Sequence, residues 1–279
     1  MPLRAHILAL LLLLAAGGAH GQAESYIHEG DRHFQQMGYA RAVEAYRVAA
    51  ELGAVNEHVT KRLAECHMRL GDMAEAERWY AIVVKFLNRE PVDMLHYAQA
   101  LKSNGNYVEA EEWMDRYLAT KGEAGRRSNI VSFARKFAQD QERFEVRSVS
   151  TNSPYADFGA AWLNDGRVLF TSARNERTTV DRRAALNDQP FLDLYVADVG
   201  AGGDLENVRP LAGRVNTRLH EGPATASAGG DELWFTRNLA QRNQQGISRL
   251  GIYRATMRDG KYGKGAPFAY NNPEISNGH

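Results

Sequence analysis

The sequence of 279 residues is poor in three features that would narrow its function at once. It has one cysteine, Cys66, which excludes an intrachain disulfide and a metal site of several thiolates. It has no net charge, because 34 Lys and Arg residues balance 34 Asp and Glu residues. Neither nucleic acid nor an anionic membrane is therefore favoured as a partner. It also has no apolar run long enough to span a bilayer, since Ile7–Ala16 has only ten residues.

That apolar run belongs to a segment typical of a signal peptide. Arg4 stands before it, small residues follow it, and Ala19 and Gly21 occupy the −3 and −1 positions that suit a signal peptidase. We therefore expect residues 1–21 to be a signal peptide and the protein to be secreted across the inner membrane into the periplasm. A buried N-terminal helix is the alternative, but it leaves a run that is leucine-rich on every face unexplained.

The sequence also lacks the motifs that mark an enzyme. It holds no G-x-S-x-G nucleophile elbow, and Gly200–Leu205 fails the dinucleotide fingerprint. His28 and His33 are five residues apart, which does not place them on one helix face at ligand spacing. Glu111 and Glu112 are neighbours on a helix surface, where solvation is the better interpretation than acid–base work. We therefore expect no catalytic residue, no metal site and no cofactor.

From about residue 24 to residue 120 the apolar residues follow a helical period that itself repeats. Three alanines are spaced by 34 residues, at Ala42, Ala76 and Ala110. A large side chain stands four positions after each of them, at Tyr46, Tyr80 and Met114. A small residue lets two helices approach closely, and a 34-residue period with this pair resembles the tetratricopeptide repeat. The resemblance implies three helix pairs over residues 24–120.

One further helix is expected in residues 121–143, as a cap or linker after the repeats. Its apolar face is formed by Ile130, Phe133, Ala134 and Phe137. A lone amphipathic helix after stacked units is best explained as a lid over the exposed face of the last unit.

The repeats predict a concave groove lined by the first helix of each pair. On the repeat alignment the lining mixes charged, amide and aliphatic side chains: Lys61, Glu65, Arg69, Leu95, Gln99 and Lys102. This mixture suits an extended peptide or a protein tail. The alternative is that these are ordinary solvated positions, since charged residues are mostly exposed.

After about residue 144 the period of the apolar pattern changes to two. In Phe191–Val199 the residues Leu192, Leu194 and Val196 fall on one face, which is typical of a half-buried strand. Similar short segments recur between glycine-rich turns such as Asn164–Gly166. The pattern predicts an all-β region over residues 144–279.

This second region also repeats. Phe170 and Phe235 are 65 residues apart within two similar stretches, and the pattern looks like two blades of a TolB-type β-propeller. A propeller closes with 4–8 blades, so two blades are an incomplete ring. The pair Asn272 and Gly278 repeats the spacing that opens each blade, which favours a chain cut at the start of a third blade. A two-blade protein that closes its ring by oligomerising is the alternative.

The order of these parts resembles the OmpA-family envelope proteins of Bacteroidetes, which include components of type IX secretion. The stretches that carry the resemblance are Asn152–Arg174 and Val215–Asn238, although "SAGGD" departs from the S-x-D-G of such blades. The resemblance implies association with the outer membrane. It implies contact with peptidoglycan only through a C-terminal domain that lies outside this sequence.

Together these features predict an α+β multidomain protein, in which an α-helical tetratricopeptide solenoid is followed by an incomplete all-β propeller. The expected function is a non-enzymatic periplasmic scaffold or adaptor that binds envelope proteins or an extended peptide segment, with no nucleic-acid partner. For a longer parent, the resemblance adds a role in type IX secretion and cell-wall anchoring. Two alternatives stay open: an envelope hydrolase whose catalytic domain lies beyond His279, and a periplasmic sensor of a small ligand.

Overall fold

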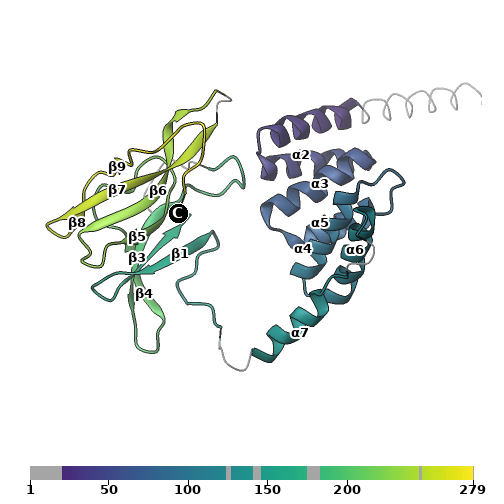
Figure 1. Cartoon of the computed structure of the whole chain (residues 1–279). Coiled ribbons are helices and arrows are strands. Elements are labelled where there is room, and N and C mark those ends of the chain that lie inside the picture. The colour runs from purple at the N-terminus through teal and green to yellow at the C-terminus, as the bar shows by residue number, and fades with distance from the viewer. Residues whose placement is uncertain (1–20, 124–126, 141–145, 175–182, 245–246, 279) are drawn as a thin grey trace, which may run out of the picture. The chain divides into compact units, whose positions relative to one another are not determined.

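The computed structural model describes residues 21–123, 127–140, 146–174, 183–244 and 247–278 (Figure 1). The signal peptide expected at residues 1–21 lies outside these ranges except for its last residue. The chain divides into two compact units, which are described separately below. The helical unit is Met1–Glu145 with Ala185–Asp188, and the sheet unit is Val146–Ala184 with Gln189–His279. No helix among the described residues is both long and apolar enough to cross a membrane.

The helical unit is a succession of helices that each pack on the next one along the chain (Figure 1). A helix over residues 21–35 is followed by α2 (Tyr39–Glu51), α3 (Glu57–Leu70), α4 (Met73–Val83), α5 (Pro91–Ser103), α6 (Tyr107–Thr120) and α7 (Ile130–Asp140).

Local chemistry sets the ends of these helices. The Asn56 side chain accepts a hydrogen bond from the Val59 amide at 2.9 Å and so caps the start of α3. Gly71 ends α3 with a φ of 78°, a left-handed conformation that glycine adopts without strain. Asp72 then caps α4 by accepting from the Glu75 amide at 3.3 Å. A tight turn between α3 and α4 follows from Gly71 and Asp72.

The repeated small and large residues lie in the core of the helical unit. Ala42, Ala76 and Ala110 are fully buried, as are the rings of Tyr46 and Tyr80. The Tyr46 hydroxyl donates to Asp31 Oδ1 at 2.6 Å, and the Tyr80 hydroxyl lies 3.0 Å from His96 Nδ1. Met114, which holds the same place in the last pair, is only half-buried.

The sheet unit contains two antiparallel sheets (Figure 1). The first has four strands in the order of the chain: β1 (Asp157–Trp162), β2 (Val168–Ser172), β3 (Asp193–Val199) and β4 (Leu205–Pro210). The second has five strands: β5 (Glu221–Ala226), β6 (Glu232–Arg242), β7 (Ser248–Arg258), β8 (Lys261–Tyr262) and β9 (Ala266–Pro267). Strands β5 to β8 also follow the order of the chain, and β9 pairs with β7.

The predicted fold class, a helical solenoid followed by an incomplete propeller, is wrong. The helices are followed by two sheets of four and five strands, and these do not close into a propeller or a barrel. The sheets instead share one core: Leu163, Leu169, Leu194, Val196, Leu211, Val215, Ala224, Leu233, Phe235, Ala255 and Tyr262. Alternating strands with glycine-rich turns occur in every antiparallel architecture, so the repeat in the sequence identified similar sheets but could not identify a ring.

An asparagine that follows each sheet in the chain makes two hydrogen bonds to the backbone of one residue in that sheet. The Asn216 side chain accepts from the Leu194 amide at 2.8 Å and donates to the Leu194 carbonyl at 2.9 Å. Asn271 makes the same pair of bonds with Ile252, at 2.9 and 2.8 Å. The sequence pointed to Asn272 for this repeated position, whereas the structure gives it to Asn271.

Candidate functional site

The six predicted groove residues lie on two helices, α3 and α5. Three of them follow one face of α3 at four-residue spacing, namely Lys61, Glu65 and Arg69. The other three lie on α5, namely Leu95, Gln99 and Lys102. The charged members have different surroundings, and these decide which of them is available to a partner.

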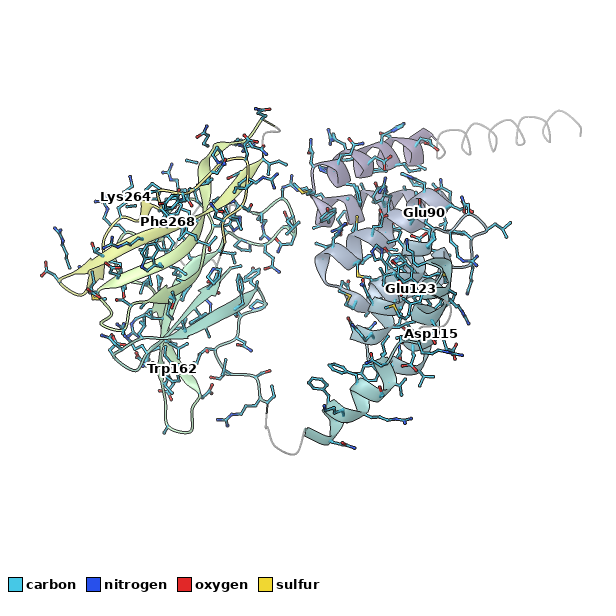
Figure 2. All side chains as sticks on the ribbon, viewed as in Figure 1. Glu90, Asp115, Glu123, Trp162, Lys264 and Phe268 are labelled. Atoms are coloured by element: carbon cyan, nitrogen blue, oxygen red, sulfur yellow. The ribbon has the colours of Figure 1, made fainter. Side chains whose placement is uncertain are left out.

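Lys61 is occupied by carboxylates of the helical unit itself. Its ammonium lies 2.5 Å from Glu90 Oε2 and 3.3 Å from Asp93, which links α3 to the start of α5 (Figure 2). Burial opposes the charged form, but these two carboxylates raise the pKa of Lys61 above its usual value. Glu65 in turn accepts from Arg62 at 2.7 Å. These side chains stabilise the helix stack, and they leave little unsatisfied charge for a ligand.

Lys102 lies at a different place, in a hollow of the helical unit. A pocket of about 650 Å³ opens between the end of α5, the start of α6 and α7. We call it the α7 pocket, and its lining is mainly apolar: Lys102, Tyr107, Asn129, Ile130, Phe133, Ala134, Phe137 and Ala138. An apolar pocket with a few polar groups is the usual form of a binding site.

Two exposed phenylalanines of α7 form part of the apolar wall of this pocket. Phe133 is 57% exposed and Phe137 is 58% exposed, and their ring centroids lie 4.6 Å apart. Neighbouring exposed apolar side chains that line a pocket are typical of surfaces that contact another molecule.

The predicted lid over residues 121–143 therefore covers its neighbours only in part. The start of α7 is fixed to α6, because the Ser128 amide donates to Asp115 Oδ1 at 2.7 Å and the Val131 amide donates to Glu111 at 2.9 Å. Ile130 packs against the core of α4, α5 and α6. The rest of the apolar face stays open, and residues 141–143 lie outside the described part of the chain.

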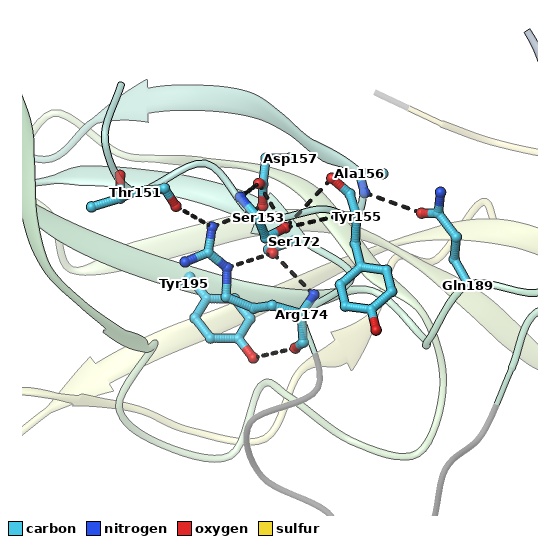
Figure 3. Close-up of polar contacts among 9 residues, drawn as sticks. All are labelled: Thr151, Ser153, Tyr155, Ala156, Asp157, Ser172, Arg174, Gln189 and Tyr195. Atoms are coloured by element: carbon cyan, nitrogen blue, oxygen red, sulfur yellow. Dashed lines mark hydrogen bonds and ion pairs between the residues drawn. The ribbon is translucent and has the colours of Figure 1, made fainter. Parts of the chain in front are cut away.

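A second group of converging polar side chains lies in the first sheet, around Arg174 (Figure 3). The Arg174 guanidinium donates to Asp157 at 3.0 Å, to Ser172 Oγ at 2.8 Å and to the Thr151 carbonyl at 2.9 Å. Asp157 also accepts from Ser153, through its amide at 2.6 Å and its hydroxyl at 2.8 Å. Although burial raises the pKa of Asp157, these hydrogen bonds hold it below the usual value. The network is closed on itself, which makes it structural.

The second sheet repeats this arrangement more deeply in the core. Arg237 Nε donates to Glu221 Oε1 at 2.8 Å, and the two side chains are 5% and 0% exposed. Thr217 donates to Glu221 with its amide at 3.0 Å and its hydroxyl at 2.5 Å, as Ser153 does to Asp157. Burial raises the pKa of Glu221 to about 7. The two arginine–carboxylate pairs are a matched structural device, one in each sheet.

Glu221 makes the stability of the sheet unit depend on pH. Its pKa rises from 4.5 to about 7 on folding because burial disfavours the carboxylate. This contribution to stability is therefore complete below about pH 4.5 and is lost as pH rises through about 7. We expect the wild type to lose stability relative to Glu221→Gln over that range in urea unfolding. Parallel pH profiles of the two proteins would contradict the assignment.

The described part of neither unit holds a candidate metal centre. Among the described residues, no three His, Cys, Asp or Glu side chains are grouped so that they could hold a metal ion. Cys66 is buried on α3, and burial raises the pKa of its thiol to about 12, so it is a poor nucleophile there.

No family model matches the chain, and no curated protein matches it. The resemblance to OmpA-family envelope proteins therefore stays a prediction from the sequence.

Proposed function

We propose that this protein is a non-enzymatic adaptor of the cell envelope whose helical unit binds a segment of another protein in the α7 pocket. The observation that supports this is the exposed pair of Phe133 and Phe137 at the wall of a pocket of about 650 Å³. Large apolar side chains in a partly enclosed hollow are the residues that dominate protein–protein binding energy.

The periplasmic location in this proposal rests on the signal peptide expected at residues 1–21. Envelope proteins are accordingly the expected partners. Contact with peptidoglycan belongs to the proposal only for a longer protein that carries a cell-wall-binding domain.

Photo-cross-linking in intact cells that make the protein tests this proposal. A photoreactive phenylalanine analogue at Phe137 is expected to give one discrete adduct with another protein. The same analogue at Leu87, which is fully exposed on the helical unit but outside the pocket, is the matched control and should give none. No adduct from Phe137, or equal adducts from both positions, would contradict binding at the α7 pocket.

A further inference from the structure

We infer that the segment bound in the α7 pocket is a single amphipathic α-helix, which lies on α7 as α6 lies on α5. The inference rests on the proposed function, because it names the form of the partner at the same site. It is based on a comparison of α5 with α7: the two helices have the same apolar pattern, but within the described ranges another helix packs over this face only on α5.

The two helices carry the same apolar pattern. On α5 the positions i, i+3, i+4 and i+7 are Met94, Tyr97, Ala98 and Leu101. On α7 they are Ile130, Phe133, Ala134 and Phe137. All four residues of α5 are buried, whereas the two phenylalanines of α7 are more than half exposed. The same face is thus closed on one helix and open on the other.

What closes the face of α5 is the helix that follows it. Trp113 of α6 packs edge-on against Tyr97, with ring centroids 5.3 Å apart. Ala110 of α6 is fully buried in the same cluster as Leu101 and Ala100. Among the described residues, the element that follows α7 is the strand β1, so α7 receives no such helix from its own unit. Phe133, which corresponds to Tyr97, is left for an outside helix to cover.

The far wall of the pocket is open for the same reason. At the start of α4, the Met73 carbonyl accepts from the Asn104 side chain at 2.9 Å, so the turn before α6 covers it. Tyr107 has the corresponding place at the start of α6, and it lines the pocket and is 42% exposed. A helix that began beside Tyr107 and ran along Phe133 would repeat the way in which α6 follows α4.

The chain itself shows which sequence such a helix needs. The second helices of the pairs carry alanine and then a large residue four positions later, as with Ala76 and Tyr80 of α4. Lys102 lines the pocket, and no ion pair involving it is found in the part of the chain that the structure describes. A carboxylate in the first turn of the incoming helix would pair with Lys102 and would suit the helix dipole. The partner is therefore an amphipathic helix with an acidic first turn.

A peptide with the sequence Asp72–Leu87, which contains α4, is a suitable probe. It has the small and large residues and an acidic start, and a side-chain staple between positions 74 and 78, away from Ala76 and Tyr80, keeps it helical. We expect the labelled peptide to bind the full chain in an anisotropy titration. Phe133→Asp should weaken binding about tenfold or more, as loss of a central aromatic does. Leu87→Ser in the protein is the control that should leave affinity unchanged.

The peptide variant Ala76→Arg distinguishes binding through the alanine face of the helix from nonspecific hydrophobic binding. It is expected to bind about tenfold or more weakly than the parent peptide. No binding of the parent peptide, or equal binding of the variant, overturns the inference. If the cross-link at Phe137 persists in that case, the adaptor function stands with an occupant of another form. In the free full chain, the variant Phe137→Cys is expected to react with an alkylating reagent. Resistance to alkylation would show that the chain covers this surface itself, and would also overturn the inference.

Discussion

Glu221→Ala is expected to lower the free energy of unfolding of the sheet unit by about 3–5 kcal/mol, because it leaves a buried arginine without its carboxylate. Arg237 is 5% exposed, and its guanidinium lies over the rings of Phe235 and Tyr253 at 4.9 and 4.8 Å from their centroids. No water can replace the lost partner at such depth without opening the core. The loss should be larger at about pH 5 than at about pH 8, because the contribution of Glu221 to stability falls as pH rises through about 7.

Native-state hydrogen exchange of the β6 amides measures this loss in the sheet unit alone. The double variant Glu221→Leu with Arg237→Met is the matched control, since replacing both charges by apolar groups is often nearly neutral. Asp157→Ala should cost less, because the side chains of Arg174 and Asp157 are 10% and 14% exposed and water can reach them. A loss below about 1 kcal/mol for Glu221→Ala is the size expected of a solvent-exposed ion pair, and would contradict the assignment of Glu221 and Arg237 as a buried pair.

Local periodicity was sufficient to predict a helical region followed by a region of strands. The caps at Gly71 and Asp72 depend on neighbouring residues, and the buried faces of α3 to α6 follow the helical period. The closure of a propeller depends instead on how sheets pack on one another, which no local period records. Two similar sheets that share one core produce the same repeat in the sequence as two blades of a ring.

The candidate site was predicted only in part, for the same physical reason. Lys61 was assigned to a groove because its spacing placed it on the right face of α3. Its partners Glu90 and Asp93 lie 29 and 32 residues away, and a contact across that separation is not visible in helical spacing. The apolar face of α7 was identified correctly, but only the structure shows that Phe133 and Phe137 lack a cover.

The paired arginines were missed although the repeat contained them. Aligning Phe170 with Phe235 sets Ser172, and not Arg174, against Arg237. Arg174 lies two residues past the end of β2, whereas Arg237 lies within β6, yet each guanidinium donates to a carboxylate of the first strand of its sheet. The Arg174 guanidinium donates both to Ser172 Oγ and to Asp157. Allowing a shift of two residues between the two similar stretches would have revealed the pair.

Tyr80→Ala is expected to destabilise the helical unit by about 3–5 kcal/mol, as removal of a fully buried aromatic ring does. The Tyr80 ring is completely buried between α4 and α5, and its hydroxyl lies 3.0 Å from His96 Nδ1. The variant therefore creates a cavity and also removes a hydrogen bond. Urea unfolding followed by circular dichroism at the helical band measures the loss.

Met114→Ala is the matched control, because Met114 holds the same repeat position in α6. It is half-buried, since α7 covers α6 only in part, and we expect a loss of about 1 kcal/mol. The difference between the two variants thus measures how much less enclosed the last helix pair is than the one before it. Equal losses would show that α6 is as well covered as α4, and would contradict the open face on which the α7 pocket and its proposed partner depend.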